Sequence, residues 1–298
     1  MKGSSSANWV SFMGGPPTDF TYPRVIEREL LRAGRQVVVR NLAQTSEPVN
    51  HGLKNWEPQV YPWSPDVVVL NYGLFESVHL FLPRFLERHA HSLRGRPGPV
   101  RHVYRRFVLR PVWQALARVQ QRVDSVAPPI LFARRARRFA DDLEELIQRL
   151  LTIGSPLVLV CELPPAGERW RTWFPGINGR LEQVNAAAVE AVRRIDRPEV
   201  RLFPTKEALA ELVAEGHDIV PDGGHFTPAA HHALGSALAR EILAWFGPHP
   251  VPLSSGETHQ GRPQPRGPAE RLDDDARGRR AARLDYRGEG TGPGANAR

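Results

Sequence analysis

Short apolar segments of strand length alternate with helical patterns along the first 247 residues of this 298-residue chain. Apolar strand patterns fall at Val37–Val39, Asp66–Asn71, Pro156–Leu163 and Val200–Phe203. Helical patterns end near Gly34 and cover Asn185–Arg194, Lys206–Glu215 and Pro228–Phe246. Strands that are apolar throughout and separated by helices are typical of a parallel sheet covered on both faces. The sequence therefore predicts an α/β fold with three layers, α/β/α, over residues 1–247.

A basic segment interrupts this alternation between residues 77 and 140, with fourteen arginines opposed only by Glu87 and Asp124. Apolar and aromatic residues are interleaved with the arginines, which predicts a mostly helical insertion or cap. It is either a basic surface for anionic lipid or an anionic substrate, or an ordinary solvated face above an apolar stripe. We favour the second interpretation, because the basic residues of the whole chain are overwhelmingly Arg and their charge is weak evidence of function.

Composition changes after Phe246, where the chain becomes rich in Pro, Gly, Arg and Asp. Residues 248–298 cannot bury enough apolar surface to offset their ordering entropy, so they are predicted to be disordered. The single cysteine, Cys161, lies in an apolar strand and is expected in the core. The sequence as written has no secretory signal and no membrane-spanning window, which predicts a cytoplasmic location.

An acid and an imidazole lie three residues apart in Asp222-Gly223-Gly224-His225, directly before the last predicted helix. Asp222 can take the Nδ1 proton of His225, which leaves Nε2 as a base. Thr227 and Pro228 are expected at the N-cap and first position of that helix. The alternative is an Asx-turn and a helix-capping histidine. His231 and His232 follow without a second ligand cluster, so neither a metal nor a cofactor is expected.

A nucleophile for this pair is available near the N-terminus, in Gly3-Ser4-Ser5-Ser6, which we interpret as a small-residue turn that follows a strand and presents a serine at the carboxyl edge of the sheet. Together with the late Asp-x-x-His motif, this segment resembles the SGNH, or GDSL-type, hydrolase superfamily. The resemblance implies that Ser5 is the nucleophile, with Asp222 as acid and His225 as base, on a flavodoxin-like parallel sheet. Ser4 and Ser6 remain alternatives for the nucleophile.

The resemblance also implies an oxyanion hole, and here the sequence departs from the family pattern. Ser46 stands where a glycine is expected and Phe75 where an asparagine is expected. Candidates for the oxyanion site are therefore Ser46, Asn71 and Gly73. Only two residues precede Gly3, so the first strand is expected to be truncated: either the true start lies upstream, which we favour, or the sheet lacks its central strand.

The function implied by the resemblance is that of a serine esterase or acyl hydrolase acting on a small ester or an acylated carbohydrate or lipid. Two alternatives remain open. One is a catalytically impaired binding module that uses the basic segment, and the other is an acyltransferase with the same triad. Anionic lipid or another polyanion is a possible peripheral partner, and no specific nucleic acid is predicted. The sequence identifies neither the substrate nor the oligomeric state.

Overall fold

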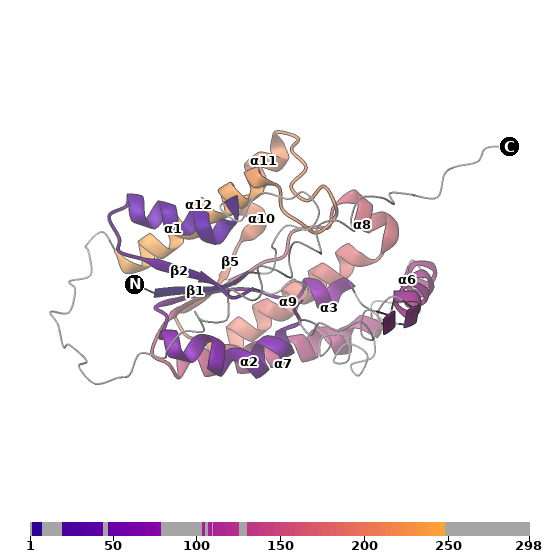
Figure 1. Cartoon of the computed structure of the whole chain (residues 1–298), viewed down its shortest axis with the longest axis horizontal. Helices are drawn as coiled ribbons and strands as arrows, with labels where there is room; N and C mark the ends of the chain where they lie inside the picture. Colours follow the sequence, from indigo (N-terminus) through magenta and orange to yellow (C-terminus); the bar gives the residue numbers. More distant parts are fainter. Residues whose placement is uncertain are drawn as a thin grey trace. The chain divides into compact units, whose positions relative to one another are not determined.

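Five parallel strands form one sheet in the order β2-β1-β3-β4-β5 (Figure 1). The strands are β1 (Lys2–Ala7), β2 (Val38–Asn41), β3 (Val67–Asn71), β4 (Leu157–Cys161) and β5 (Val200–Phe203). The computed structural model describes residues 2–7, 20–43, 47–78, 103–104, 107–108, 110–124 and 130–247. This strand order is that of flavodoxin-like sheets, so the predicted fold class is confirmed.

The N-terminal serine segment itself forms an interior strand of the sheet. Lys2–Ala7 pairs with β2 on one side and with β3 on the other, and Ser5 is level with Asn41 and Val69. The less favoured alternative, in which the sheet lacks this strand, is therefore wrong. The expectation that the serines lie on a turn after a strand also differs from the structure, because β1 continues two residues beyond Ser5.

Helices cover both faces of the sheet, as the apolar strands require. In β3 and β4 every residue is buried, and side chains alternate between two apolar clusters. Val68 and Val158 belong to the cluster beneath α2 (Val49–Val60), α7 (Ile130–Leu151) and α9 (Ile177–Ile195). Val69 and Leu159 belong to the cluster beneath α1 (Tyr22–Arg32) and α12 (Pro228–Phe246) (Figure 1). Buried Cys161 lies in the second cluster, where burial raises the pKa of its thiol to about 12.

Short helices follow the carboxyl ends of β3, β4 and β5. They are α3 (Leu74–Val78), α8 (Glu168–Trp173), α10 (Thr205–Ala208) and α11 (Ala210–Ala214), while the 3-10 helix η2 (Tyr61–Trp63) precedes β3. The single helix predicted over Lys206–Glu215 is thus two helices, separated at Leu209. The helix expected near Asn185 begins earlier, at Ile177.

The basic segment is helical where the structure describes it, in α6 (Arg110–Asp124) and in α7. α7 runs without interruption through residue 140, so the predicted insertion has no boundary there. Phe132 and Phe139 are buried, whereas Arg134, Arg137 and Arg138 are exposed. This part of the segment is a core helix with a solvated basic face. Most of residues 79–109 and all of the predicted tail, 248–298, lie outside the described residues.

A buried ion pair anchors α6. Asp124 contacts the guanidinium of Arg180 on α9, and both residues are almost fully buried. The other Asp124 oxygen accepts the N–H of Gly176 at 2.9 Å, and Arg180 Nε donates to the Ser77 carbonyl at 2.6 Å. One acid of the basic segment therefore has a structural role that its composition did not indicate.

This pair predicts an asymmetric response to substitution. Asp124→Leu leaves a buried guanidinium without its counter-ion, which should lower the free energy of unfolding by about 3–5 kcal/mol. The double variant Asp124→Leu/Arg180→Met replaces both charges with apolar groups and should recover most of that loss. Urea unfolding followed by circular dichroism measures both. Equal losses in the single and double variants would contradict this account.

Candidate active site

Asp222 and His225 face each other within one four-residue loop, which we call the 222–225 loop. Asp222 Oδ2 contacts His225 Nδ1 directly. Asp222 Oδ1 accepts the backbone N–H groups of His225 at 2.8 Å and Gly224 at 3.1 Å. The three interactions hold the carboxylate and the imidazole in one orientation. The Nε2 atom of His225 is shielded from solvent. Because the carboxylate contacts Nδ1 and leaves Nε2 as the second ring nitrogen, the pair has the geometry of an acid that orients a base.

The same contacts act on the ionisation of Asp222. Partial burial disfavours the charged carboxylate, but the hydrogen bonds from Gly224 and His225 outweigh it, and the pKa of Asp222 is lowered from its ordinary value of 3.8. Asp222 is therefore an anion at neutral pH. An anionic acceptor keeps the imidazole proton on Nδ1 and stabilises the imidazolium that forms when Nε2 accepts a proton.

The two glycines of the loop are required by the indole of Trp170, on α8. Gly223 has a φ of +102°, and a Cβ built on it would lie 2.0 Å from Trp170 Cδ1. A Cβ on Gly224 would lie 2.7 Å from the same ring. Gly167, just before α8, donates its N–H to the Gly223 carbonyl at 3.3 Å. The indole thus forms a platform for the 222–225 loop, and only glycine can lie against it.

The loop is fixed at its other end by the start of α12. The Thr227 hydroxyl accepts the N–H of Ala230 at 3.2 Å, and Pro228 follows at the first helical position. The predicted cap is therefore confirmed. One turn into α12, His231 is buried whereas His232 is exposed. Burial, with a smaller contribution from the charge that His225 can carry, lowers the pKa of His231 from 6.5 to about 4.

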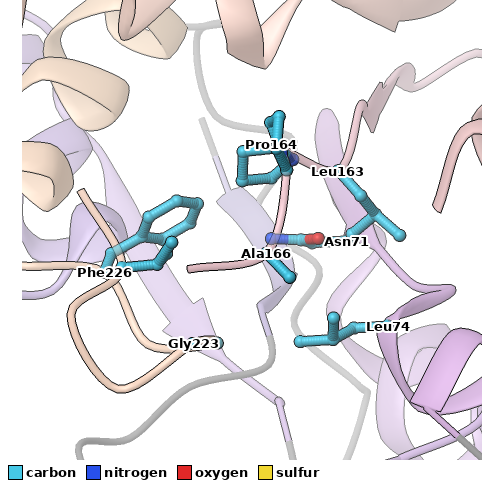
Figure 2. A pocket seen from close by; sticks show the side chains of 10 residues that line it. Asn71, Leu74, Leu163, Pro164, Ala166, Gly223 and Phe226 are labelled. Carbon is cyan, nitrogen blue, oxygen red and sulfur yellow. The ribbon is translucent and has the colours of Figure 1, made fainter. Parts of the chain in front are cut away.

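A pocket lies beside the loop at the carboxyl ends of β3 and β4 (Figure 2). Its walls are mostly apolar and are formed by Asn71, Leu74, Leu163, Pro164, Pro165, Ala166, Val220, Gly223, Gly224 and Phe226. Asn185 on α9 fixes the proline-rich wall, because its side chain bonds both the N–H and the carbonyl of Leu163 at 2.9 Å. Among the described residues of the wall, Asn71 alone has a polar side chain, and it is buried.

The predicted oxyanion residues have different positions. Asn71, the last residue of β3, lines the pocket together with the 222–225 loop. Gly73 has a φ of +112°, and a Cβ there would lie 2.4 Å from Val184 Cγ1, so packing and conformation explain this glycine. Ser46 lies outside the described residues. Of the three candidates, Asn71 is the one that the structure places at the pocket.

Ser5 is placed by its backbone alone. It lies in β1, opposite Val69 of β3, while Ala7 lies opposite Asn71. The ligand sites of open parallel sheets lie at the carboxyl ends of the strands, which is the edge that carries the pocket and the 222–225 loop. Among the described residues, no group of three His, Cys, Asp or Glu side chains could hold a metal ion.

Trp170, Asn185 and His231 were not recognised from the sequence as parts of the site. For His231 a local signal exists, because it falls on the buried stripe of α12 with Leu234 and Leu238, which follow it at helical spacings of three and seven. Trp170 and Asn185 act across long sequence separations on the 222–225 loop and on Leu163. No periodicity in the chain indicates such contacts.

Comparison with solved structures places this architecture among esterases and acylhydrolases. A lipase/acylhydrolase from Enterococcus faecalis matches over 81% of this chain and 94% of its own, with 17% identity and a TM-score of 0.51. Est24, a carbohydrate acetylesterase from Sinorhizobium meliloti, matches over 82% and 99%, with 12% identity and a TM-score of 0.53. The fold that the resemblance implied is therefore confirmed.

A third solved structure gives a similar match. A catalytic mutant of Axe2, an acetylxylan esterase from Geobacillus stearothermophilus, matches over 81% of this chain and 93% of its own, with 14% identity and a TM-score of 0.51. No protein-family model matches the chain, and no curated protein matches it. No helix in the described ranges is long and apolar enough to cross a membrane.

The contact between Gly223 and Trp170 leads to a prediction with a matched control. Gly223→Ala combines an unfavourable φ with a steric clash, so it should cost about 1–3 kcal/mol of stability more than a glycine that has only the φ penalty. Gly216→Ala is that control, because Gly216 has a φ of +80° and open space around its Cβ position. Urea unfolding of the two variants measures the difference. Equal losses would show that Trp170 does not restrict the loop.

The buried His231 leads to a prediction about acid stability. Above pH 6.5 the residue is neutral in both the folded and the unfolded chain, so it adds no pH dependence. Between pH 6.5 and about 4 only the unfolded chain takes up the proton, so folding stability falls, by about 3 kcal/mol at pH 4. Unfolding free energies at pH 7 and pH 4.5 should therefore differ more for the natural chain than for His231→Asn. The same pH dependence in both proteins would contradict a buried neutral His231.

Proposed function

We propose that this chain is a serine esterase that hydrolyses esters with small acyl groups. The observation that carries the proposal is the Asp222–His225 contact beside an apolar pocket at the carboxyl edge of the sheet. Ser5 comes from β1, an interior strand of that sheet. The fold shared with a carbohydrate acetylesterase and a lipase/acylhydrolase supports the same class of reaction. The mostly apolar wall of the pocket suits a small acyl group.

In the proposed mechanism, Ser5 Oγ attacks the ester carbonyl while His225 Nε2 accepts its proton. The tetrahedral intermediate collapses, and the imidazolium gives that proton to the leaving alcohol oxygen. Water, which His225 deprotonates, then attacks the acyl-enzyme. The proton returns to Ser5 Oγ as the carboxylic acid departs, and this regenerates Ser5. Asp222 remains ionised throughout and stabilises the imidazolium. The Asn71 side chain is the proposed donor to the oxyanion.

Turnover of p-nitrophenyl acetate tests the assignment of the triad. Ser5→Ala and His225→Ala should each lower kcat/KM by about 10³-fold or more, and Asp222→Asn by roughly 10³–10⁴-fold because it allows the wrong tautomer. Ser4→Ala and Ser6→Ala are the matched controls for the nucleophile, and His232→Ala is the control for the base. Each should retain most of the activity. A folded Ser5→Ala variant with natural turnover would overturn the assignment.

The role proposed for Asn71 is tested separately. Asn71→Leu removes an amide donor and should lower kcat by about 10²–10³-fold with a smaller effect on KM, because the bond forms chiefly in the transition state. Asn71→Asp retains the size of the side chain but places a negative charge beside the oxyanion, so it should be at least as damaging. Full activity of either variant would remove Asn71 from the mechanism.

A second candidate function is peripheral binding to an anionic membrane through α6. Val112 and Val119 are 43% and 54% exposed, and the exposed Arg118 and Arg122 lie on the adjoining face of the helix. Asp124, the one acid in α6, is buried against Arg180. The exposed side of α6 therefore combines apolar groups and positive charge without an opposing carboxylate, which suits an anionic bilayer.

Vesicle sedimentation tests this second function. The chain should bind phosphatidylglycerol vesicles more tightly than phosphatidylcholine vesicles, and binding should weaken as salt rises. Arg118→Gln/Arg122→Gln should reduce binding, whereas the charge-matched control Arg149→Gln/Arg193→Gln on α7 and α9 should not. Equal binding to both vesicle types, or equal loss in both double variants, would contradict the proposal.

A further inference from the structure

His231 connects the two parts of the chain that carry the proposed triad. Its Nδ1 accepts the backbone N–H of Tyr22 at 3.3 Å, across a separation of 209 residues. Tyr22 is the first residue of α1, the next described helix after β1 and Ser5. His231 itself lies one turn into α12, six residues after His225. The buried His231 imidazole therefore links the start of α1 to the start of α12. α1 is the next described helix after the strand that carries Ser5, and α12 follows the 222–225 loop.

The ring of His231 also packs against both sides of this junction. It meets the ring of Phe226 edge-on, with centroids 5.6 Å apart and an interplanar angle of 77°. It lies tilted against the Tyr22 ring at 5.9 Å. Phe226 follows His225 directly and is part of the pocket wall. A displacement of His231 would therefore be transmitted to the residue next to the base.

Tyr22 extends the connection to the other wall of the pocket. Its ring is fully buried, and its hydroxyl lies near the side chain of Asn71, the proposed oxyanion donor. Tyr22 thus contacts His231 through its backbone N–H, while its side chain lies near Asn71. The base loop and the oxyanion candidate therefore lie on either side of one buried group of residues.

We propose that His231 is a positioning residue for catalysis: as a neutral acceptor it holds the 222–225 loop in register with the nucleophile strand. Because Nδ1 accepts from Tyr22, the ring proton lies on Nε2. The inference rests on the proposed esterase function, and it assigns no contact with substrate to His231. A shift of about 1 Å between base and nucleophile can cost on the order of 10²-fold in rate, so loss of this hydrogen bond should appear in kcat.

Two substitutions distinguish the contribution of the Nδ1 acceptor of His231 from that of its aromatic ring. His231→Phe keeps an aromatic ring of similar size and removes the acceptor. His231→Asn shortens the side chain but places an amide oxygen close to the position of Nδ1. The exposed neighbour supplies the controls His232→Phe and His232→Asn. Circular dichroism confirms that each variant is folded before kinetics are measured.

With p-nitrophenyl acetate at pH 7.5, His231→Phe should lower kcat by about 10–100-fold with little change in KM. His231→Asn should recover most of that kcat, and both His232 variants should match the natural protein. Natural kcat in a folded His231→Phe, or equal losses in the Phe and Asn variants, would overturn the proposal. The second outcome would show that ring packing matters and the acceptor does not.

Hydrogen exchange keeps this test independent of the esterase proposal. Mass spectrometry should show roughly tenfold faster amide exchange in peptides that cover residues 20–26 and 220–227 of His231→Phe, and near-natural exchange in His231→Asn. If the natural protein has no esterase activity, the proposed function fails, and the exchange data still decide whether His231 holds the two segments together. Unchanged exchange in His231→Phe would exclude that role.

Discussion

The contact between Asp222 and His225 is the interaction on which the candidate site depends. An acid and a base three residues apart can meet only if the intervening chain turns tightly, and Gly223 with its positive φ provides that turn. The indole of Trp170 then lies so close that neither intervening residue can carry a side chain. Backbone conformation and tertiary packing thus require the same residue type, which makes the loop rigid before any substrate arrives.

The sheet determines where this loop can act. β3 and β4 are buried on both faces, so no ligand can approach them except at their ends. The carboxyl ends carry Asn71, the wall that begins at Leu163, and the 222–225 loop. β1, the strand that carries Ser5, is an interior strand beside β3, and its carboxyl end lies at the same edge of the sheet. The proposed chemistry therefore follows from the topology as much as from the motif.

Local features of the fold and site could be predicted from the sequence. The strands were visible because a sheet buried on both faces requires continuous apolar segments, and Thr227 and Pro228 marked a helix start through their own conformational preferences. Asp222 and His225 were visible because they interact within four residues. The place of Lys2–Ala7 in the sheet was not predicted, because three serines have none of the apolar character of β3 or β4 and are held by backbone pairing.

Local sequence patterns do not predict contacts between residues that are far apart in the chain. Asp124 looked like one acid among many arginines, but it is buried against Arg180, 56 residues away. The arginines near the start of α7 suggested an insertion, yet three of them, Arg134, Arg137 and Arg138, lie on the exposed face of this core helix. Trp170, Asn185 and His231 support the site through contacts with residues that are distant in sequence. Their roles depend on which elements pack together, and no local composition specifies that.

We propose that Ser5 is the nucleophile activated by the Asp222–His225 pair. Treatment of the protein with a fluorophosphonate, followed by peptide mass spectrometry, identifies the residue that reacts. We expect one phosphonyl group, on Ser5, with labelling slowed strongly in Asp222→Asn and abolished in His225→Ala. No adduct on the folded protein, or an adduct on another residue that forms at the same rate in His225→Ala, would contradict it.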